Sequence, residues 1–406
     1  MRGQRLLLGL TLVFGGGSAL ADDALFGLID ERLRHMRDVA LHKWHHQLPI
    51  EDVARERVVV RSARRAAVRH GVDGDGAERF FIAQIEAAKT IQSHWFGRWD
   101  TEPPRRQAPD LATDIRPRLL ELGDEIVARL RQVPASSTAR AAFDAALTTE
   151  GLSTGSRVAL FAALGATNRY ASTLARIAAN GELRVGTAGD YAPFTYSAND
   201  ESWVGVDIDQ ARDLGKALGV PVRFVPTSWP TLMDDVLDGR FDIAMGGISR
   251  NVARARLARF TGPYFTDGKT AIARCADAAL YTSLGDVDRP GVRVIVNPGG
   301  TNQRFVDANI REASVIVWPD NRTVFDEIAA GRADVMFTDG IEVRLQTVRH
   351  PGLCGALPAL TYLDKAYLIP RIQGDRAWLE TVNVWLEQRV ASGAVERLIE
   401  RHVNAR

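Results

Sequence analysis

The chain of 406 residues has little of three things: cysteine, surplus charge of one sign, and long apolar runs. Two cysteines are too few for a disulfide-rich scaffold, and no Cys or His spacing is typical of a metal site. The 51 Lys and Arg residues balance the 50 Asp and Glu residues, so the net charge of +1 suggests no nucleic-acid or membrane-surface partner. Past the N-terminus, no segment is apolar over the length of a transmembrane helix. These features predict a soluble globular protein, and its length predicts two or three domains.

Residues 1–21, MRGQRLLLGLTLVFGGGSALA, have the layout of a secretory signal peptide: two Arg, an apolar run and a small-residue A-x-A end. The alternative is an uncleaved membrane anchor, but the apolar run is too short to span a bilayer comfortably. We therefore expect cleavage after Ala21 and a mature protein in a bacterial periplasm or outside the cell. In such an oxidising compartment Cys275 and Cys354 are a plausible disulfide, whose loop is worth roughly 4 kcal/mol at most.

The hydrophobic periodicity changes along the chain. Residues 22–165 carry apolar residues at spacings of 3 and 4, with breaks at Pro49 and at three other loops, which predicts an all-α domain of four or more helices. Residues 166–177 connect this domain to the next. Residues 178–406 alternate β-type runs such as FDIAMGG and ADVMFTDG with helical patterns, which predicts an α/β domain with largely parallel sheets. Nearly every strand ends in Gly, Asn, Ser or Thr, where open α/β sheets bind ligands.

Cations share a face with apolar residues in the helical half. Arg32, Met36, Val39 and Lys43 are spaced 4, 3 and 4, so they lie along one side of a helix. The simpler interpretation is that the cations snorkel at the edge of the apolar stripe. Later segments favour a cavity instead, because they add further polar groups at helical spacing, namely Asp52, Arg55, Glu56, Gln84 and Gln92. Three cations and an amide donor around one cavity predict a small dianion as ligand.

The run Gln47-Leu48-Pro49-Ile50-Glu51-Asp52, together with Arg32, Lys43 and Arg55, resembles the exported all-helical chorismate mutases over roughly residues 22–160. The resemblance implies that Arg32 and Arg55 bind the carboxylates of chorismate. It implies that Lys43 and Gln92 bond the ether oxygen, and that Asp52 and Glu56 contact the ring hydroxyl region. Some relatives have Glu at the position of Gln92, whereas Gln donates at any pH. A further arginine of some relatives has no clear match among Arg116, Arg118 and Arg129.

The α/β half resembles the two-lobed periplasmic amino-acid-binding receptors, in which the Arg of a GIS…R segment, here Arg254, clamps the ligand's carboxylate. It resembles cyclohexadienyl dehydratase more closely over about 178–405, through GDYAPF, PTSWP, DGKT, IVNPGGTN, TDGIE-RLQ and DKAYLIPR. Cys275 and Cys354 also sit as in that family. Prephenate dehydration must hold two carboxylates and protonate a leaving hydroxyl. We expect these groups from Arg254 and Lys269 for charge, Thr301 and Asn302 for hydrogen bonds, and Trp229 and Tyr191 as ring walls.

The resemblance places the general acid on Glu342 in the segment TDGIEVRLQ. The alternative is an ordinary first-turn helix carboxylate, stabilised by the helix dipole. Burial would raise its pKa enough for it to act as an acid near neutrality. In amino-acid receptors the residue matching Asp339 pairs with the ligand's ammonium, which arogenate has and prephenate lacks. For Trp229 and Tyr191, a packing role is as good an interpretation as a role at the site.

The two resemblances fit each other, because prephenate is the product of the first predicted domain and the substrate of the second. The sequence predicts an exported bifunctional enzyme acting on chorismate, prephenate and arogenate, with no cofactor. The alternative is a chorismate mutase fused to a non-catalytic receptor for an amino acid or another solute. The sequence leaves open the oligomeric state, a homo-oligomer included.

Overall fold

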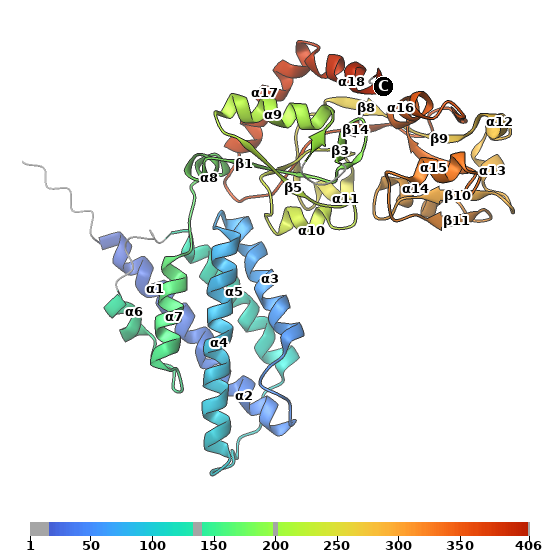
Figure 1. Ribbon diagram of the computed structural model, residues 1–406. Helices are drawn as coiled ribbons and strands as arrows, with labels where there is room; N and C mark the ends of the chain where they lie inside the picture. Colours follow the sequence, from blue (N-terminus) through green and yellow to red (C-terminus); the bar gives the residue numbers. More distant parts are fainter. Residues whose placement is uncertain (1–15, 133–139, 198–201, 405–406) are drawn as a thin grey trace, which may run out of the picture. The chain divides into compact units, whose positions relative to one another are not determined.

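The computed structural model describes residues 16–132, 140–197 and 202–404. Contacts divide the chain into two compact units, Met1–Tyr170 and Ala171–Arg406, and this division falls within the predicted connecting segment 166–177. Figure 1 shows only helices in the first unit, and strands interleaved with helices in the second, which confirms the expected fold class. Most of the expected signal peptide, residues 1–15, lies outside the described residues. No helix in the described ranges is long and apolar enough to cross a membrane.

The helical unit consists of long helices linked by short turns. Its elements are α1 (Gly16–Arg34), α2 (Met36–His45), α3 (Val53–His70), α4 (Gly74–Trp99), the π-turn η1 (Leu111–Ile115), α5 (Arg116–Leu130), α6 (Arg140–Ala146) and α7 (Thr154–Gly165). Helix α4 is central, because it packs against α2, α3 and α7. Its buried face, with Phe80, Phe81, Ile91 and Trp95, follows the 3–4 spacing of the sequence and joins the core of α1.

The break between α2 and α3 has a clear local cause. Pro49 cannot continue a helix, and the chain turns with Gln47 in the left-handed region at φ 51°. Helix α3 then begins at Asp52, whose carboxylate accepts the backbone N–H of Arg55 as an N-cap. The QLPIED segment is therefore a turn that ends one helix and starts the next.

The α/β unit contains two five-stranded sheets. The first lobe has the order β5-β1-β6-β15-β7, and the second lobe has the order β11-β10-β12-β9-β13. The strands are β1 (Leu183–Thr187), β2 (Asp190–Tyr191), β3 (Thr195–Ser197), β4 (Trp203–Val204), β5 (Val222–Pro226), β6 (Ile243–Ala244), β7 (Arg259–Phe260), β8 (Phe265–Asp267), β9 (Lys269–Arg274), β10 (Arg293–Val296), β11 (Ser314–Val317), β12 (Val335–Asp339), β13 (Leu353–Gly355), β14 (Leu363–Lys365) and β15 (Leu368–Ile369). The pairs β1–β5, β1–β6, β10–β11 and β10–β12 are parallel, whereas β9, β13 and β15 pair antiparallel with their neighbours.

Helices surround both sheets (Figure 1). They are α8 (Thr173–Asn180), α9 (Val206–Leu218), α10 (Leu232–Leu237), α11 (Val252–Ala255), α12 (Cys275–Ala278), α13 (Leu284–Val287), α14 (Thr301–Asn309), α15 (Val324–Ala329), α16 (Gly340–Arg349), α17 (Ala377–Ala391) and α18 (Ala394–Asn404). In the second lobe the two sheet faces have separate cores, one around Val294 and Phe337 and the other around Ile295 and Met336. This alternation along β10 and β12 is what a parallel sheet covered on both faces requires.

The chain crosses between the lobes twice. It leaves the first lobe after β7, passes through β8 and enters the second lobe at β9; it returns from β13 through β14 to β15. Strands β8 and β14 pair with each other antiparallel and form a two-stranded ribbon between the lobes. In the second lobe, Cys275 and Cys354 form a disulfide between the end of β9 and β13.

Candidate active sites

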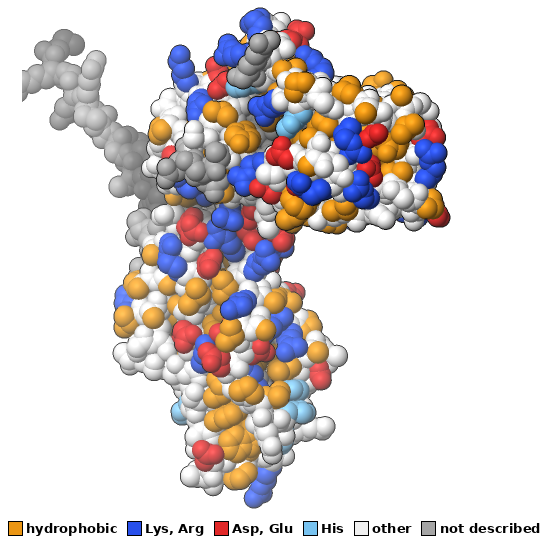
Figure 2. Space-filling view, turned by 45° about the vertical axis from the view of Figure 1, so that its right-hand side comes forward, with side chains coloured by type: hydrophobic (Ala, Val, Ile, Leu, Met, Phe, Trp, Pro, Cys, Tyr) orange, Lys and Arg blue, Asp and Glu red, His pale blue; other side chains and the backbone are white. Residues whose placement is uncertain are grey.

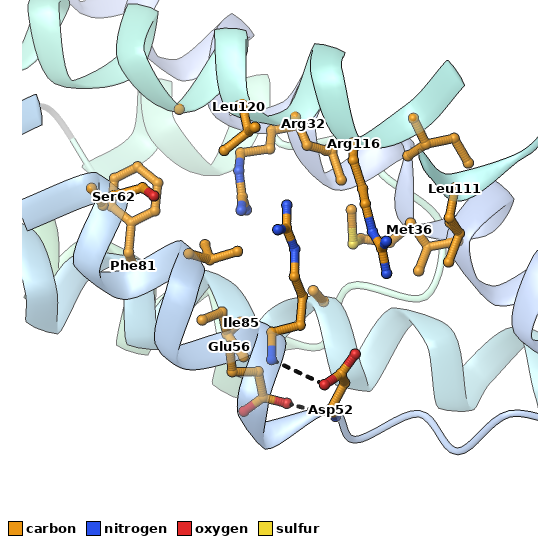
Figure 3. Close-up of a pocket in the computed structure, with 18 of the residues that line it drawn as sticks. Arg32, Met36, Asp52, Glu56, Ser62, Phe81, Ile85, Leu111, Arg116 and Leu120 are labelled. Atoms are coloured by element: carbon orange, nitrogen blue, oxygen red, sulfur yellow. Dashed lines mark hydrogen bonds between the residues drawn. The ribbon is translucent and has the colours of Figure 1, made fainter. Parts of the chain in front are cut away.

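The helical unit encloses a cavity of about 460 Å³ between α1, α2, α3, α4 and α5. Figure 3 shows Arg32 and Arg116 pointing into it from one side, with Asp52 and Glu56 on the opposite side. Apolar side chains form much of the remaining wall, among them Met36, Val39, Val59, Phe81, Ile85, Leu111, Ile115 and Leu119. Six of the predicted mutase residues line this cavity: Arg32, Lys43, Asp52, Arg55, Glu56 and Gln92. The six residues chosen from the sequence therefore lie around a single cavity.

Arg32 is the most deeply buried cation of the cavity, with 5% of its surface exposed. One of its Nη atoms donates to Oε1 of Gln84 at 3.2 Å, and its guanidinium lies over the ring of Phe81 at 5.4 Å. Its Nε has no hydrogen-bond partner among the described residues. Burial lowers the pKa of Arg32 to about 10, so it remains charged at neutral pH. A buried cation whose protein contacts are neutral favours an anionic ligand.

Lys43 is held by the turn that follows its own helix. Its Nζ donates to the carbonyl oxygen of Ile50 at 2.5 Å, and this is how the QLPIED turn fixes the position of the ammonium. Burial lowers the pKa of Lys43 from its ordinary value, while Asp52 and Glu56 oppose that shift. Burial and the charge of Arg116 likewise lower the pKa of Arg55. The cations of this cavity therefore repel one another, and a bound anion would offset that repulsion.

Asp52 and Glu56 have structural partners at the start of α3. The carboxylate of Asp52 caps the helix through the N–H of Arg55 at 3.0 Å. That of Glu56 accepts the N–H of Asp52 at 3.3 Å and pairs with Lys89 at 3.0 Å. Both residues line the cavity, so their predicted contact with the ring hydroxyl region stays a prediction with a second, structural role beside it.

Gln92 lies in the buried wall of the cavity. Its Nε2 donates to the carbonyl oxygen of Ala88 at 3.2 Å, and its Oε1 has no partner within the described ranges. An amide nitrogen carries two N–H groups, so one remains for a ligand oxygen. Ala88, one turn earlier, also lines the cavity and offers only a methyl group.

The sequence did not show which residue matches the further arginine of some chorismate mutases. The side-chain contacts of the three candidates now distinguish them. Arg116 lines the cavity at the first residue of α5. Arg118 instead pairs with three glutamates, and Arg129 donates to Gln132. The π-turn η1 sets the register of α5 at its start, and a helical pattern read from the sequence does not reveal such a turn.

The second candidate site lies between the two lobes of the α/β unit, in a cavity of only about 20 Å³. It is lined by Tyr191, Trp229, Gly247, Ser249, Arg254, Asn297, Gly300, Thr301, Asn302, Asn321, Asp339 and Lys365. The lobes are closed onto each other: Asn321 of the second lobe donates to the carbonyl oxygen of Asp190 in the first at 2.8 Å. A ring-sized ligand therefore requires the lobes to separate before it enters.

Asp339 is the centre of a buried ion cluster. Its Oδ1 accepts a hydrogen bond from Nζ of Lys269 at 2.6 Å, and its Oδ2 accepts one from Nζ of Lys365 at 2.5 Å. The hydroxyl of Tyr191 also donates to Oδ2, which links the first lobe to the second. Burial alone would raise the pKa of Asp339, but Lys365 and Lys269 hold it well below its ordinary value. Asp339 is therefore an anion whose two oxygens are both engaged by cations.

Glu342 lies in the first turn of α16 and is 1% exposed. It accepts the hydroxyl of Thr338, and it is not among the residues that line the cavity. Burial raises the pKa of Glu342 to about 8, and the charges of Asp339 and Asp190 add to the shift. A solvated first-turn carboxylate would not be buried in this way, and the N–H of Ile341 at this helix start is instead accepted by Asp267 at 2.8 Å. Glu342 thus holds its proton at neutral pH.

Arg254 and Trp229 face the cavity from the first lobe. Arg254 is buried, donates to the carbonyl oxygen of Ser249 at 2.9 Å, and lies 6.0 Å from the ring of Trp229. Its Nε has no partner in the described part of the chain. The indole N–H of Trp229 donates to Asp190 at 3.0 Å, and burial raises the pKa of that carboxyl to about 6. The guanidinium is free on one edge to take an oxyanion.

Thr301 and Asn302 begin α14 at the end of the NPGG turn, and both line the cavity. Asn302 connects the turn to the ion cluster, because its Oδ1 accepts Lys269 and its Nδ2 donates to Asn297 at 3.0 Å. Lys269 itself lies behind these groups, outside the lining. Sequence reasoning missed Lys365, Ser249, Asn297 and Asn321 in this site. For Lys365 a signal was present, since DKAYLIPR places a lysine inside an apolar strand pattern.

Residues 183–405 match the bacterial extracellular solute-binding proteins, family 3. The chain belongs to this family. Within this family-3 protein, residues 18–93 also match chorismate mutase type II, which covers most of α1 to α4. Both matches agree with the two resemblances stated from the sequence.

Three relatives illustrate the similarity. Cyclohexadienyl dehydratase of Pseudomonas aeruginosa is 46% identical over 237 residues, which cover 58% of this chain and 87% of the relative. Secreted chorismate mutase of Yersinia pestis is 36% identical over 105 residues, which cover 26% and 56% respectively. The crystal structure of the ancestral amino acid-binding protein AncCDT-1, a precursor of cyclohexadienyl dehydratase, is 33% identical with a TM-score of 0.53, covering 57% of this chain and all of that one. The fold thus serves both binding proteins and an enzyme, so the site has to decide between them.

Proposed function

We propose that this protein is an exported enzyme with two activities. The helical unit rearranges chorismate to prephenate. The α/β unit converts prephenate to phenylpyruvate, and arogenate to phenylalanine, by decarboxylative dehydration. The match to chorismate mutase type II and the identity to cyclohexadienyl dehydratase support the pairing of these activities, because the product of the first is the substrate of the second.

The first reaction needs a shaped cavity and donors rather than a nucleophile. Rearrangement of chorismate breaks a C–O bond and forms a C–C bond in one step, and negative charge develops on the ether oxygen. Arg32, Arg55 and Arg116 are placed to bind the two carboxylates in the compact conformer. Lys43 and the second N–H of Gln92 donate to the ether oxygen.

The second reaction needs a proton, and Glu342 supplies it. Prephenate dianion and one proton give phenylpyruvate, carbon dioxide and water: the ring C–C bond to the carboxylate breaks, its electrons enter the ring, and the hydroxyl leaves as water. Formation of the aromatic ring drives the step. Glu342 is protonated at neutral pH because its pKa is raised to about 8, and it regains a proton from solvent afterwards. This buried acid is the observation that carries the proposal, since a receptor for amino acids has no need of it.

Arg254 is the proposed clamp for one substrate carboxylate, and Trp229 and Tyr191 are the proposed walls for the ring. Tyr191 also bonds Asp339, so it has a structural role beside this one. Asp339 orients the two lysines, and Thr301 and Asn302 complete the far wall. Because Glu342 lies behind the lining, the lobes must rearrange with substrate for the acid to reach the leaving hydroxyl.

Relatives on both sides are secreted or extracellular proteins, so the chain is of an exported kind. We place the mature protein in a bacterial periplasm, after cleavage near Ala21. N-terminal sequencing of the exported protein should begin at Asp22; a mature chain that still carries residues 1–21 would contradict the cleavage.

The deciding experiment follows phenylpyruvate formed from chorismate by the full-length mature chain. The wild type should form phenylpyruvate without added metal or cofactor. An Arg55→Ala variant should fail on chorismate but still turn over added prephenate. If chorismate yields prephenate that then accumulates, the α/β unit is a receptor fused to a mutase, and the second half of the proposal is wrong.

A further inference from the structure

The ion cluster of the α/β unit has an excess of positive charge. One carboxylate, that of Asp339, lies between two ammonium groups, those of Lys269 and Lys365. The three side chains are 1–2% exposed, so solvent does not screen the surplus. An unbalanced charge is costly in such surroundings, and an anion beside the cluster would offset that cost.

The two lysines do not have equal hydrogen bonding. Lys365 donates to Asp339, to Oγ of Ser249 at 2.9 Å and, more weakly, to the hydroxyl of Tyr191 at 3.3 Å. Lys269 donates to Asp339 and Asn302, and its third N–H has no acceptor among the residues that the structure describes. Lys365 lines the cavity, so a ligand oxygen can replace its long bond to Tyr191, whereas Lys269 lies behind the lining and contributes its charge.

Lys365 lies at the cavity wall, where its ammonium can contact a ligand. It lines the cavity together with Arg254, whereas the resemblance to binding proteins points only to the arginine. It ends strand β14, which forms the two-stranded ribbon between the lobes with β8, and it contacts groups of both lobes. Arg254 belongs to the first lobe, so the two cations meet a ligand from different parts of the fold.

We infer that Lys365, with Lys269, forms a second carboxylate seat, so that the cleft binds a small dicarboxylate dianion through Arg254 at one end and the lysine pair at the other. The sign of the local charge agrees with this assignment, because the three cations outnumber the carboxylates of Asp339 and Asp190 and the cleft therefore favours an anionic ligand. The inference rests on the proposed function for the identity of the ligand as prephenate. The seat itself requires only two carboxylates on one frame.

The lysine seat has a consequence for catalysis. We assign the side-chain carboxylate to Arg254, because the matching arginine of the amino-acid receptors clamps the ligand's carboxylate. The carboxylate at the lysines is then the one on the ring, which loses its charge as carbon dioxide departs. An interaction that is stronger with the bound substrate than with the transition state contributes to binding and not to rate. Lys365 is therefore a specificity residue for the dianion, and not a source of rate enhancement.

The test compares prephenate with phenylpyruvate, which lacks the ring carboxylate. Calorimetric titration uses the full chain with Glu342→Gln, in which turnover is slowed, with and without Lys365→Met. We expect Lys365→Met to weaken prephenate binding at least about 30-fold and phenylpyruvate binding less than about threefold. Lys365→Arg should keep most of the prephenate affinity, and Lys216→Met, at an exposed site on α9, should change neither.

Steady-state kinetics in the chain with Glu342 intact give an independent measurement. Lys365→Met should raise KM for prephenate by a similar factor without lowering kcat. Equal weakening of both ligands, a fall in kcat at unchanged KM, or no change would each overturn the inference and leave Lys365 as a structural partner of Asp339. If the wild type forms no phenylpyruvate while the selective loss of dianion binding persists, the seat stands and the proposed second activity fails.

Discussion

The two candidate sites gather positive charge in different ways. The helical unit has a cavity of about 460 Å³ in which Arg32, Lys43 and Arg55 make few contacts with anions. The α/β unit has a closed cavity of about 20 Å³ in which Asp339 binds two lysines and an acid lies buried behind them. A cavity that is lined by cations and fits one conformer is sufficient for a rearrangement that transfers no proton. Elimination of water needs a proton as well, and the second site contains a buried carboxyl, that of Glu342, whose pKa is raised to about 8.

The surface does not explain either site. Figure 2 shows Lys and Arg side chains interleaved with Asp and Glu over the visible face, as expected for a net charge of +1. Positive charge at each site is therefore local and comes from single placed side chains. This makes the comparison testable, because one substitution should affect one activity and leave the other intact.

The largest effect should follow Glu342→Gln. Gln fills the same space but cannot give up a proton, so prephenate turnover should fall about 100- to 10,000-fold. Mutase activity should stay within a factor of two. The measurement is phenylpyruvate formation from prephenate, with chorismate consumption by the same sample as the control for folding. Near-normal prephenate turnover would show that another group is the acid.

How much the sequence predicts differs between the two sites. In the helical unit the spacing from Arg32 to Lys43 and the break at Pro49 are local features, and six predicted residues line one cavity. Arg116 could not be assigned because the π-turn before it changes the helical register. In the α/β unit, the strands expected from FDIAMGG and ADVMFTDG are present as β6 and β12, but the antiparallel partner β9 was not predicted. Its order in the sheet depends on contacts between distant segments, which no local pattern encodes.

The second effect in size should follow Lys43→Met, which removes a donor aimed at the developing charge. Mutase kcat should fall about 100- to 1,000-fold, and prephenate turnover should not change. Lys89→Met is the matched control: Lys89 also lines the cavity, but it is engaged by Glu51, Glu56 and Glu86. Its loss should cost less than about tenfold. Equal losses from both substitutions would mean that the cavity responds to overall charge and not to a placed donor.

Lys365 shows most clearly what a linear reading misses. It follows Asp339 by 26 residues and Lys269 by 96, and the three meet only because the chain returns from the second lobe through β14. The sequence places Asp339 at the end of an apolar strand pattern, where ligands are expected, and Lys269 was assigned through the resemblance of the DGKT segment. It shows no such position for Lys365, which sits on a short strand of the ribbon between the lobes. The lysine beside the apolar run of DKAYLIPR is a signal for Lys365, but no spacing in the sequence connects it to Asp339.

A third prediction separates the stability of the two units. Described cysteines occur only in the α/β unit, where the disulfide joins positions 79 residues apart. Replacing Cys275 and Cys354 by Ala should cost about 2–4 kcal/mol through the entropy of the unfolded chain. For a unit of this size that corresponds to roughly 5–15 °C in Tm. Residual dehydratase activity after heating should decline at lower temperature in the variant, while residual mutase activity follows the wild-type curve. A parallel shift of both curves would mean that the units unfold together.

The smallest effect, and the one that contrasts the two chemistries most directly, is the response to pH. Glu342 must be protonated to act, and its pKa is raised to about 8, so kcat/KM for prephenate should be level near neutrality and fall about tenfold per pH unit above 8. The residues proposed for the mutase are Gln92, which does not titrate, and cations that are charged at neutral pH. Its rate should therefore be flat through this range and fall only when Lys43 and Arg32 lose their protons in more alkaline solution. The free energy of unfolding should also fall as the pH rises. A carboxyl whose folded pKa lies above its unfolded value binds more protons when folded, so its contribution to stability is lost as pH rises toward 8. The Glu342→Gln variant should therefore gain in Tm relative to the wild type between pH 5 and pH 8.5, and a constant difference would show that Glu342 is already ionised in the folded cleft.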